Sequence, residues 1–242
     1  MELKRNSSYE VTMRVSIVIP VLNEADGIVL FLESLQALRR AGHQVIVADG
    51  GSSDATLQRA SGRVDRLIQS PAGRARQMNA GALAANGEII LFLHADSQLP
   101  ELAIATIVES MRATGRSWGR FDIKLRGDRF LFRVVEWFMN MRSRLTGIAT
   151  GDQGIFVERQ MFESVGGFPD IPLMEDIALC VRLKKIERPI CLAAAIRTSS
   201  RRWERRGPWR TILLMWRLRF AYWRGADPAI LARTYYPNRD YG

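Results

Sequence analysis

Several acidic and amide side chains of this chain come directly after hydrophobic segments. Four of them follow the first, second and fourth such segments, namely Asn23, Glu24, Asp49 and Asp96. The carboxyl ends of parallel strands meet at one edge of an open α/β sheet, and ligands bind in the crevice outside that edge. The sequence therefore predicts that these polar groups converge on a single crevice.

Asp96 indicates chemistry most strongly, because it follows five consecutive apolar residues and then His94-Ala95. An aspartate-x-aspartate pair at such a place holds a divalent cation against a nucleotide, and hard oxygen ligands favour Mg²⁺ or Mn²⁺. Here His94 stands in place of the first carboxylate, and an imidazole can ligate Mn²⁺ or hydrogen-bond a ribose. The simpler alternative is that Asp96 only caps a helix that begins near Pro100.

Asp49 precedes Gly50 and Gly51, whose backbone can turn tightly and let a ligand approach. A carboxylate at this point can accept hydrogen bonds from a base edge or a ribose. The alternative is a turn-forming aspartate that bonds only its own loop.

The acidic pair Glu175-Asp176 begins a predicted helix over 175–185. One of these carboxylates can serve as a general base that takes a proton from a hydroxyl group. The alternative is that both acids only interact favourably with the helix dipole.

Arg202-Trp203 lies in a segment rich in Arg and Ser. An arginine can bind a diphosphate through two parallel hydrogen bonds while a tryptophan packs beside it. A plain basic loop is the alternative.

The elements that must position these residues alternate regularly in the first half of the chain. Apolar runs rich in β-branched residues predict strands at 15–21, 44–48, 64–69 and 88–93. Helices are predicted between them, over about 24–40, 54–62 and 73–86. This alternation predicts an α/β fold with a mostly parallel sheet flanked by helices and joined by right-handed crossovers.

The second half is less regular. Helices are predicted over 100–114, 130–145 and 175–185, and strands over 117–125, 154–157 and 190–197. We expect one domain over residues 1–203, with residues 1–14 as a flexible N-terminus, and a basic, aromatic helical extension over 204–242.

Composition is that of an ordinary globular protein, with 242 residues, 47% hydrophobic and 25% charged. The net charge of +10 is unevenly distributed, since residues 181–242 carry 15 Lys and Arg against 4 Asp and Glu. A basic segment suits a phosphorylated ligand, a nucleic acid or an anionic membrane surface. Two cysteines, no apolar leader and no long apolar run favour a cytoplasmic protein.

The C-terminal segment has an aromatic stripe. Tryptophans recur every seven residues at 209, 216 and 223, with Leu213 and Phe220 on the same stripe. Arginines at 210, 217 and 224 follow them on an adjacent face, so the segment reads as an amphipathic helix. The stripe either packs on the domain, which we expect, or binds the membrane surface peripherally, at the inner face of the membrane.

The chain resembles family 2 glycosyltransferases, which have the GT-A fold. Five stretches carry the resemblance, in the family's order and over about residues 15–203: VSIVIPVLNEADGI, VIVADGGSSDAT, GRARQMNAGALAANGEIILFLHADSQLP, TGDQGIFVERQMFESVGGFPD and LMEDIALCVRLKK. Together with the HAD, GDQG and RRWERRG segments, they look like a bacterial subgroup associated with radical-SAM proteins and arsenosugar biosynthesis.

The resemblance implies a role for particular residues. The donor nucleotide is expected at Pro20, Asn23, Glu24, Asp49, Ser52, Asp54, Arg74, Asn79, His94 and Arg202. Asp152, Gln153 and Trp203 are expected to face the acceptor or the sugar, and Asp96, with His94, to hold Mn²⁺ or Mg²⁺. Asp176 is expected to be the catalytic base, with Glu175 as its neighbour. Ser199 replaces the glutamine of the QxxRW motif found in processive members.

The implied reaction is an inverting transfer of a hexose from a UDP- or GDP-linked donor to a small-molecule or lipid-linked acceptor hydroxyl. A sugar-1-phosphate nucleotidyltransferase is the nearest alternative, but VLNEADGI lacks the Arg or Lys of its phosphate-binding loop. A non-enzymatic module that binds nucleic acid or membrane is the alternative from another class. It has no need of carboxylates at three strand ends, and we expect no specific nucleic-acid partner.

Overall fold

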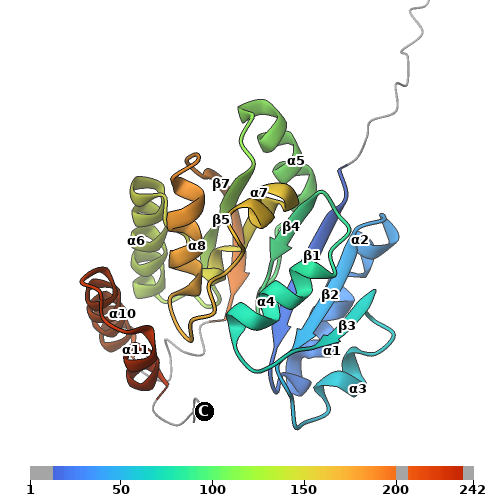
Figure 1. Cartoon of the computed structure of the whole chain (residues 1–242), viewed down its shortest axis with the longest axis horizontal. Helices are drawn as coiled ribbons and strands as arrows, with labels where there is room; N and C mark the ends of the chain where they lie inside the picture. The colour runs from blue at the N-terminus through green and yellow to red at the C-terminus, as the bar shows by residue number, and fades with distance from the viewer. Residues whose placement is uncertain (1–12, 200–206, 237–242) are drawn as a thin grey trace, which may run out of the picture.

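The computed structural model describes residues 13–199 and 207–236. At its centre is a seven-stranded sheet with the order β3-β2-β1-β4-β6-β5-β7 (Figure 1). The strands are β1 (Val15–Val21), β2 (Gln44–Asp49), β3 (Arg66–Gln69), β4 (Ile89–Phe92), β5 (Trp118–Leu125), β6 (Ile155–Glu158) and β7 (Ile190–Thr198).

The sheet is mostly parallel, as the sequence predicts. β1 lies between β2 and β4 and runs parallel to both, with Val18 opposite Ile46 on one side and Phe92 on the other. Only β6 runs against its two neighbours, β4 and β5. Both faces of β1 are buried, which explains its continuous run of apolar residues.

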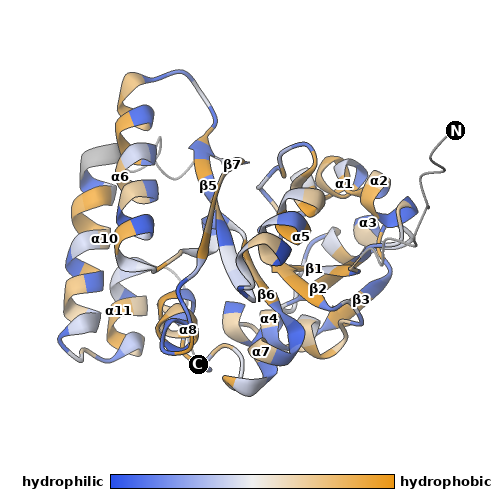
Figure 2. Cartoon of the chain, turned by 90° about the horizontal axis from the view of Figure 1, so that it is seen from above, coloured by the Kyte–Doolittle hydropathy of each residue, from blue (hydrophilic) through white to orange (hydrophobic). Residues whose placement is uncertain are grey.

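Helices cover the sheet on both faces (Figure 2). On one face lie α1 (Ala25–Ser34), α2 (Gln36–Arg40), α3 (Thr56–Ala60) and α5 (Ala103–Thr114). On the other lie α4 (Arg74–Leu83), α7 (Arg159–Ser164) and α8 (Glu175–Lys184). The two apolar cores lie between these helices and the sheet, so the sheet edge that carries the polar loops is held from both sides.

Two differences from the predicted elements have simple causes. The helix predicted over 24–40 is two helices, since α1 ends at Ser34 and α2 begins at Gln36, with Leu35 (φ −96°, ψ −5°) as the cap residue between them. Helix α7 is not predicted at all, since it has six residues and buries only Met161 and Phe162. So short an element shows no helical periodicity in the sequence.

Three further helices lie together at the end of the molecule away from β3: α6 (Phe130–Thr146), α10 (Pro208–Trp223) and α11 (Pro228–Tyr235) (Figures 1 and 2). Phe132 and Val135 of α6 pack on β5, and Ile212 of α10 joins them. Leu218 of α10 packs with α11 and with Leu173 and Met174, just before α8. The C-terminal helices are therefore packed against the rest of the chain.

The packing face of α10 is not the aromatic stripe, so that expectation is wrong. Leu213, Trp216, Phe220 and Trp223 are 58–79% exposed, and the side chain of Trp209 lies outside the described residues. The buried positions are Thr211 and Leu218. Leu218 is two residues from both Trp216 and Phe220, a rotation of about 200°, so packing by Leu218 turns the stripe outward.

Candidate active site

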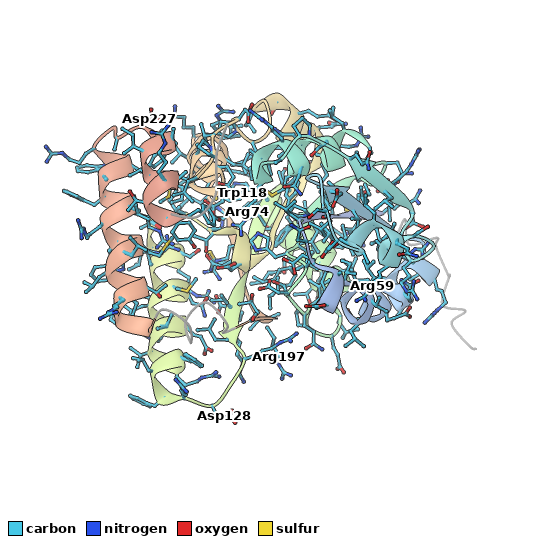
Figure 3. The ribbon with its side chains drawn as sticks, turned by 90° about the horizontal axis from the view of Figure 1, so that it is seen from below. Arg59, Arg74, Trp118, Asp128, Arg197 and Asp227 are labelled. Atoms are coloured by element: carbon cyan, nitrogen blue, oxygen red, sulfur yellow. The ribbon has the colours of Figure 1, made fainter. Side chains whose placement is uncertain are left out.

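A cleft of about 850 Å³ opens at the sheet edge where β1, β4 and β7 end. It brings together most of the charged residues that the sequence singles out: Glu24, Arg74, His94, Asp96, Asp152, Glu175 and Asp176. Helices α6, α10 and α11 form its other side. In Figure 3, Arg74 lies in the interior of the molecule, whereas Asp227 marks the outer end of the α10–α11 pair.

The loops after β1 and β2 are joined to each other by side chains. The Asn23 N–H donates to Ser52 Oγ at 2.9 Å, and the Ser53 N–H donates to Asn23 Oδ1 at 2.9 Å. Asn23 has a φ of 55°, a left-handed conformation in which asparagine is favoured among side-chain-bearing residues. These contacts join two segments that lie far apart in the sequence, and Glu24 is the residue of these two loops that lines the cleft.

Asp49 is fully buried at the end of β2. Its Oδ2 accepts hydrogen bonds from the backbone N–H groups of Gly51 and Ser52, both at 2.9 Å, and its Oδ1 accepts from the Ser52 hydroxyl. The carboxylate therefore shapes its own loop, and it does not line the cleft. Contact between Asp49 and a base stays a prediction.

Asp54 fixes the approach of Glu24 to the cleft. Its carboxylate accepts from the N–H groups of Ala25 and Thr56, at 3.1 and 2.9 Å, and from the Thr56 hydroxyl. The hydrogen bond from Thr56 is the largest cause that lowers the pKa of Asp54. Thr56 Oγ1 in turn accepts from the Glu24 N–H at 2.8 Å, so Asp54 and Thr56 position the residue that does line the cleft.

Gln77 is a positioning residue that sequence reasoning missed. It is 3% exposed, and its Nε2 donates to the carbonyl oxygens of Val21 and Ala48 at 2.7 and 2.9 Å. It thereby joins the ends of β1 and β2 under the crevice. An isolated glutamine inside an amphipathic helix gives no signal of this role, because only the fold brings the two strand ends beside it.

Asn79 is not brought to the cleft. Its Nδ2 donates to the Phe168 carbonyl at 2.8 Å, and its Oδ1 accepts from the Phe168 N–H at 3.0 Å. Both ends of the amide are therefore used to attach α4 to the loop at 168. Pro20 lies within β1, paired with Ala48, and likewise does not line the cleft.

The short 3₁₀ turn Gly151–Gln153 lies directly against the end of β4. His94 Nδ1 is 3.2 Å from Asp152 Oδ1, and a Cβ added to Gly151 would lie 2.6 Å from His94 Nε2. Glycine is needed here so that the turn can approach the imidazole. Gln153 is fully buried and accepts from the Thr150 N–H at 3.2 Å, so it shapes the turn and does not face the cleft.

The contacts of Asp96 and His94 indicate which of the two can be a metal ligand. Asp96 lines the cleft and makes no hydrogen bond or ion pair with another described residue, so its carboxylate is available for a cation. His94 is held by Asp152 on Nδ1 and covered by Gly151 on Nε2, which does not suit a ligand. Over residues 13–199 and 207–236, no cluster of three potential ligands occurs. The site thus fits a cation shared between Asp96 and phosphate oxygens, not one held by protein ligands alone.

The acidic pair begins α8 inside the cleft. Met174, just before it, has a φ of 70°, a costly conformation for a residue with a side chain that the surrounding packing must hold. Asp176 Oδ2 accepts from the Gly151 N–H at 2.9 Å, and its Oδ1 accepts from the Ile177 N–H at 2.7 Å. The 151–153 turn therefore holds both the imidazole after β4 and the carboxylate on α8.

The two acids differ in their surroundings. Glu175 is 5% exposed. Burial, and then the adjacent charge of Asp176, raise the pKa of Glu175 to about 7, against the opposing effect of Arg74. Two neighbouring carboxyl groups in a dry place do not both ionise easily, and burial puts the retained proton on Glu175. Asp176 is then the acid whose carboxylate is supported by two backbone donors.

Three arginines line the same cleft as these two acids. Arg74 begins α4, and its contacts with Tyr236 and then Glu175 and Asp152 hold its pKa above the ordinary value. Arg142 and Arg219 line the cleft from α6 and α10. Neither Arg142 nor Arg219 is predicted from the sequence, because nothing in a helical pattern shows that two basic residues 77 positions apart enter one cleft. Arg202 and Trp203 lie outside the described residues.

A mostly parallel sheet, covered by helices on both faces and with acidic and basic side chains converging at its strand ends, defines an α/β protein whose ligand site lies beyond that edge. A sequence profile of glycosyl transferase family 2 matches residues 16–163, more than half of the chain. The chain belongs to this family.

Among curated proteins, the chain is similar to an undecaprenyl-phosphate 4-deoxy-4-formamido-L-arabinose transferase of Photorhabdus laumondii. The two are 28% identical over 158 residues, which is 61% of this chain and 49% of that protein. The chain thus spans about half the length of this curated relative.

Solved structures show the same fold at low identity. A mannosyltransferase from Pyrobaculum calidifontis, in complex with GDP-Man and Mn²⁺, has a TM-score of 0.62 at 20% identity over 88% of this chain and 62% of its own. S. aureus TarS, residues 1–349 with UDP-GlcNAc, has a TM-score of 0.63 at 18% identity over 77% of this chain and 58% of its own. The fold is therefore GT-A-like, as the sequence analysis predicts.

The raised pKa of Glu175 predicts a pH-dependent stability. The native state keeps a proton that the unfolded chain loses, so the free energy of unfolding falls as the pH rises from about 4.5 to about 7. Glu175→Gln removes the titrating group, so the free energy of unfolding of the variant should not show this fall. Over that interval the variant should become more stable relative to the wild type by an amount on the order of 1–3 kcal/mol, since one pKa unit is about 1.4 kcal/mol.

Urea denaturation at pH 5 and pH 7.5, at constant ionic strength, measures the difference. Glu101→Gln, which changes an exposed glutamate, is the control and should show no such gain. A Glu175→Gln difference that does not change with pH would contradict the assignment of the retained proton to Glu175.

Proposed function

We propose that this chain is an inverting hexosyltransferase that moves a sugar from a UDP- or GDP-linked donor to an acceptor hydroxyl. The observation that carries the proposal is that Asp176, Asp96 and Arg74 come together in one cleft at the sheet edge. Relatives with this fold have been solved with UDP-GlcNAc and with GDP-Man, which supports a nucleotide-sugar donor of one of these two kinds.

In the proposed reaction Asp176 accepts the proton of the acceptor hydroxyl. The hydroxyl oxygen forms a bond to the anomeric carbon as the bond from that carbon to the diphosphate breaks, so the configuration inverts and a nucleoside diphosphate leaves. Gly151 and Ile177 hold the Asp176 carboxylate through their N–H groups. Arg74 supplies positive charge at the place where the leaving group gains negative charge.

Asp96 is the proposed protein ligand of Mn²⁺ or Mg²⁺, which would neutralise the diphosphate. Mn²⁺ in the structures of the Pyrobaculum mannosyltransferase and of a glucosyl-3-phosphoglycerate synthase from Mycobacterium tuberculosis supports this ion. In this proposal His94 positions Asp152 and does not bind the cation, because its two ring nitrogens face Asp152 and Gly151.

The proposal extends to the acceptor and to the place of action. The similarity to an undecaprenyl-phosphate sugar transferase supports a lipid-linked acceptor over a free sugar. The likeness to the bacterial subgroup associated with radical-SAM proteins and arsenosugar biosynthesis stays a hypothesis from the sequence. We propose the cytoplasm, at the inner face of the membrane, as the location.

Peripheral membrane contact is supported by the exposed face of α10. Leu213, Trp216, Phe220 and Trp223 are exposed, and three exposed arginines, at 210, 217 and 224, accompany them. An interfacial helix that carries aromatic residues and arginines in this way binds anionic lipid surfaces. None of the helices in the described part of the chain is long and apolar enough to span a bilayer.

Asp176→Asn tests the proposed base. The amide keeps the shape of the side chain and removes the proton acceptor, so turnover should fall roughly 10²–10⁴-fold while the affinity for the donor changes little. The measurement is the release of UDP or GDP from nucleotide-sugars, with donor affinity determined separately by calorimetry. Glu175→Gln is the matched control and should lose less turnover. Near-normal turnover of Asp176→Asn would remove this residue from the mechanism.

Asp96→Asn tests the shared cation. Wild-type protein should bind Mn²⁺ weakly without nucleotide and much more tightly with UDP or GDP, because phosphate oxygens complete the ligand set. In the variant this coupling should fall about tenfold or more. Titration calorimetry with Mn²⁺ alone, nucleotide alone and both together gives the coupling. Tight binding of Mn²⁺ without nucleotide would contradict a shared site.

Removal of two exposed aromatic side chains tests the membrane contact. Phe220→Ser with Trp223→Ser should weaken cosedimentation with vesicles of phosphatidylglycerol and phosphatidylcholine about tenfold or more. Burial of the apolar surface of each ring in the membrane contributes about 1.5–3 kcal/mol to the binding free energy. Leu83→Ser, which changes an equally exposed apolar side chain on α4, is the control. Absence of vesicle binding by the wild type, or equal binding by the double variant, would contradict the proposal.

A further inference from the structure

The part of the cleft away from the sheet edge is apolar. Two helices supply its walls, α6 and α10. The side chains that line it from them include Val134, Phe138, Met139, Ile212 and Met215, together with Trp216, which is 58% exposed and also belongs to the outward stripe of α10. The carboxylates and Arg74 lie at the sheet edge and at the start of α8, on the other side. A ligand that fills the whole cleft therefore has one polar part and one apolar part.

Arg142 and Arg219 lie in this cleft, one on each of the two helices. Nε and Nη2 of Arg142 and Nε of Arg219 are buried and have no hydrogen-bond partner among the described residues. The unsatisfied groups at this place are therefore N–H donors on two cationic side chains.

The positive charges of Arg142 and Arg219 also repel each other. Burial, followed by the like charge of Arg219, lowers the pKa of Arg142 to about 10, and burial lowers the pKa of Arg219. Asp176 is the acid whose charge opposes this effect on both, with Asp152 adding to it for Arg219. Buried donors without partners are costly and rare in native proteins, so the free N–H groups of these two cations suit the oxygens of an anionic ligand.

We propose that Arg142 and Arg219 bind the phosphate of a lipid-linked acceptor. Its apolar chain lies along α6 and α10, and the group that carries the attacking hydroxyl, on the other side of the phosphate, faces Asp176. A phosphate offers several oxygens to the N–H donors of two guanidinium groups, which bind phosphate through paired hydrogen bonds. The apolar walls next to the arginines suit a phosphate ester of a hydrocarbon chain better than a sugar phosphate. This inference rests on the proposed transferase function and names the class of its acceptor.

The probe is farnesyl phosphate, kept below its critical micelle concentration and added to the full chain with saturating UDP and Mn²⁺. Binding is followed by calorimetry and by the fluorescence of Trp216 and the other tryptophans. Arg142→Gln and Arg219→Gln should each weaken the binding about 10–100-fold, the size expected for loss of a charged hydrogen-bonding partner. The lysine variants, which keep the charge, should retain part of the affinity and serve where a glutamine variant does not fold.

Arg233→Gln is the matched control, because it removes the same charge from an exposed position on α11 and should change the affinity less than about twofold. Farnesol should bind at least tenfold more weakly than farnesyl phosphate, because it lacks the anion. Glucose 6-phosphate should not compete with farnesyl phosphate at equal concentration, because it lacks the chain.

Three results would overturn the inference: equal binding of farnesyl phosphate by the wild type and both glutamine variants, effective competition by glucose 6-phosphate, or loss of UDP affinity in the variants, which would assign the arginines to the donor. Failure of the proposed function is a separate result. It would appear as a wild-type chain that binds neither UDP nor GDP, with or without Mn²⁺.

Discussion

The close approach of the 151–153 turn to two other segments is the constraint on which the cleft depends. Gly151 donates its N–H to Asp176 and lies against His94 where no larger residue would fit. One turn thus sets the distance between the end of β4, which carries Asp96, and the start of α8, which carries the acidic pair. The sheet fixes the first of these segments and the α8 packing fixes the second, so the turn determines how they face each other.

The charges in the cleft follow from this arrangement. Burial leaves Glu175 with a raised pKa, while Asp176 is supported by backbone donors. Helices α6 and α10 close the cleft and bring two arginines towards Asp176. The same packing through Leu218 that forms this side of the cleft turns the aromatic stripe of α10 to the outside. The packing of α10 through Leu218 therefore determines both the shape of this side of the cleft and which aromatic residues of α10 are exposed.

The sequence predicts the sheet and most of the polar residues of the cleft, because strands buried on both faces and residues that follow them leave local patterns. It assigns Asn79 and Gln153 to ligands, whereas their amides bond backbone groups. It misses Gln77 and the arginines of α6 and α10. The reason is physical: their roles depend on contacts between segments far apart in the chain. A seven-residue repeat likewise identifies an aromatic stripe on α10 but not the direction in which the helix turns it.

Turnover of Gly151→Ala tests the central claim, that the turn at 151 positions Asp176 and His94 together. The added Cβ would lie 2.6 Å from His94 Nε2, so the turn or the imidazole must move. A misplacement of about 1 Å at a catalytic group can cost about 100-fold in rate. We predict a loss of this size in nucleoside diphosphate release per folded molecule, with some loss of thermal stability and with UDP or GDP affinity close to that of the wild type. Wild-type turnover in Gly151→Ala would contradict the account.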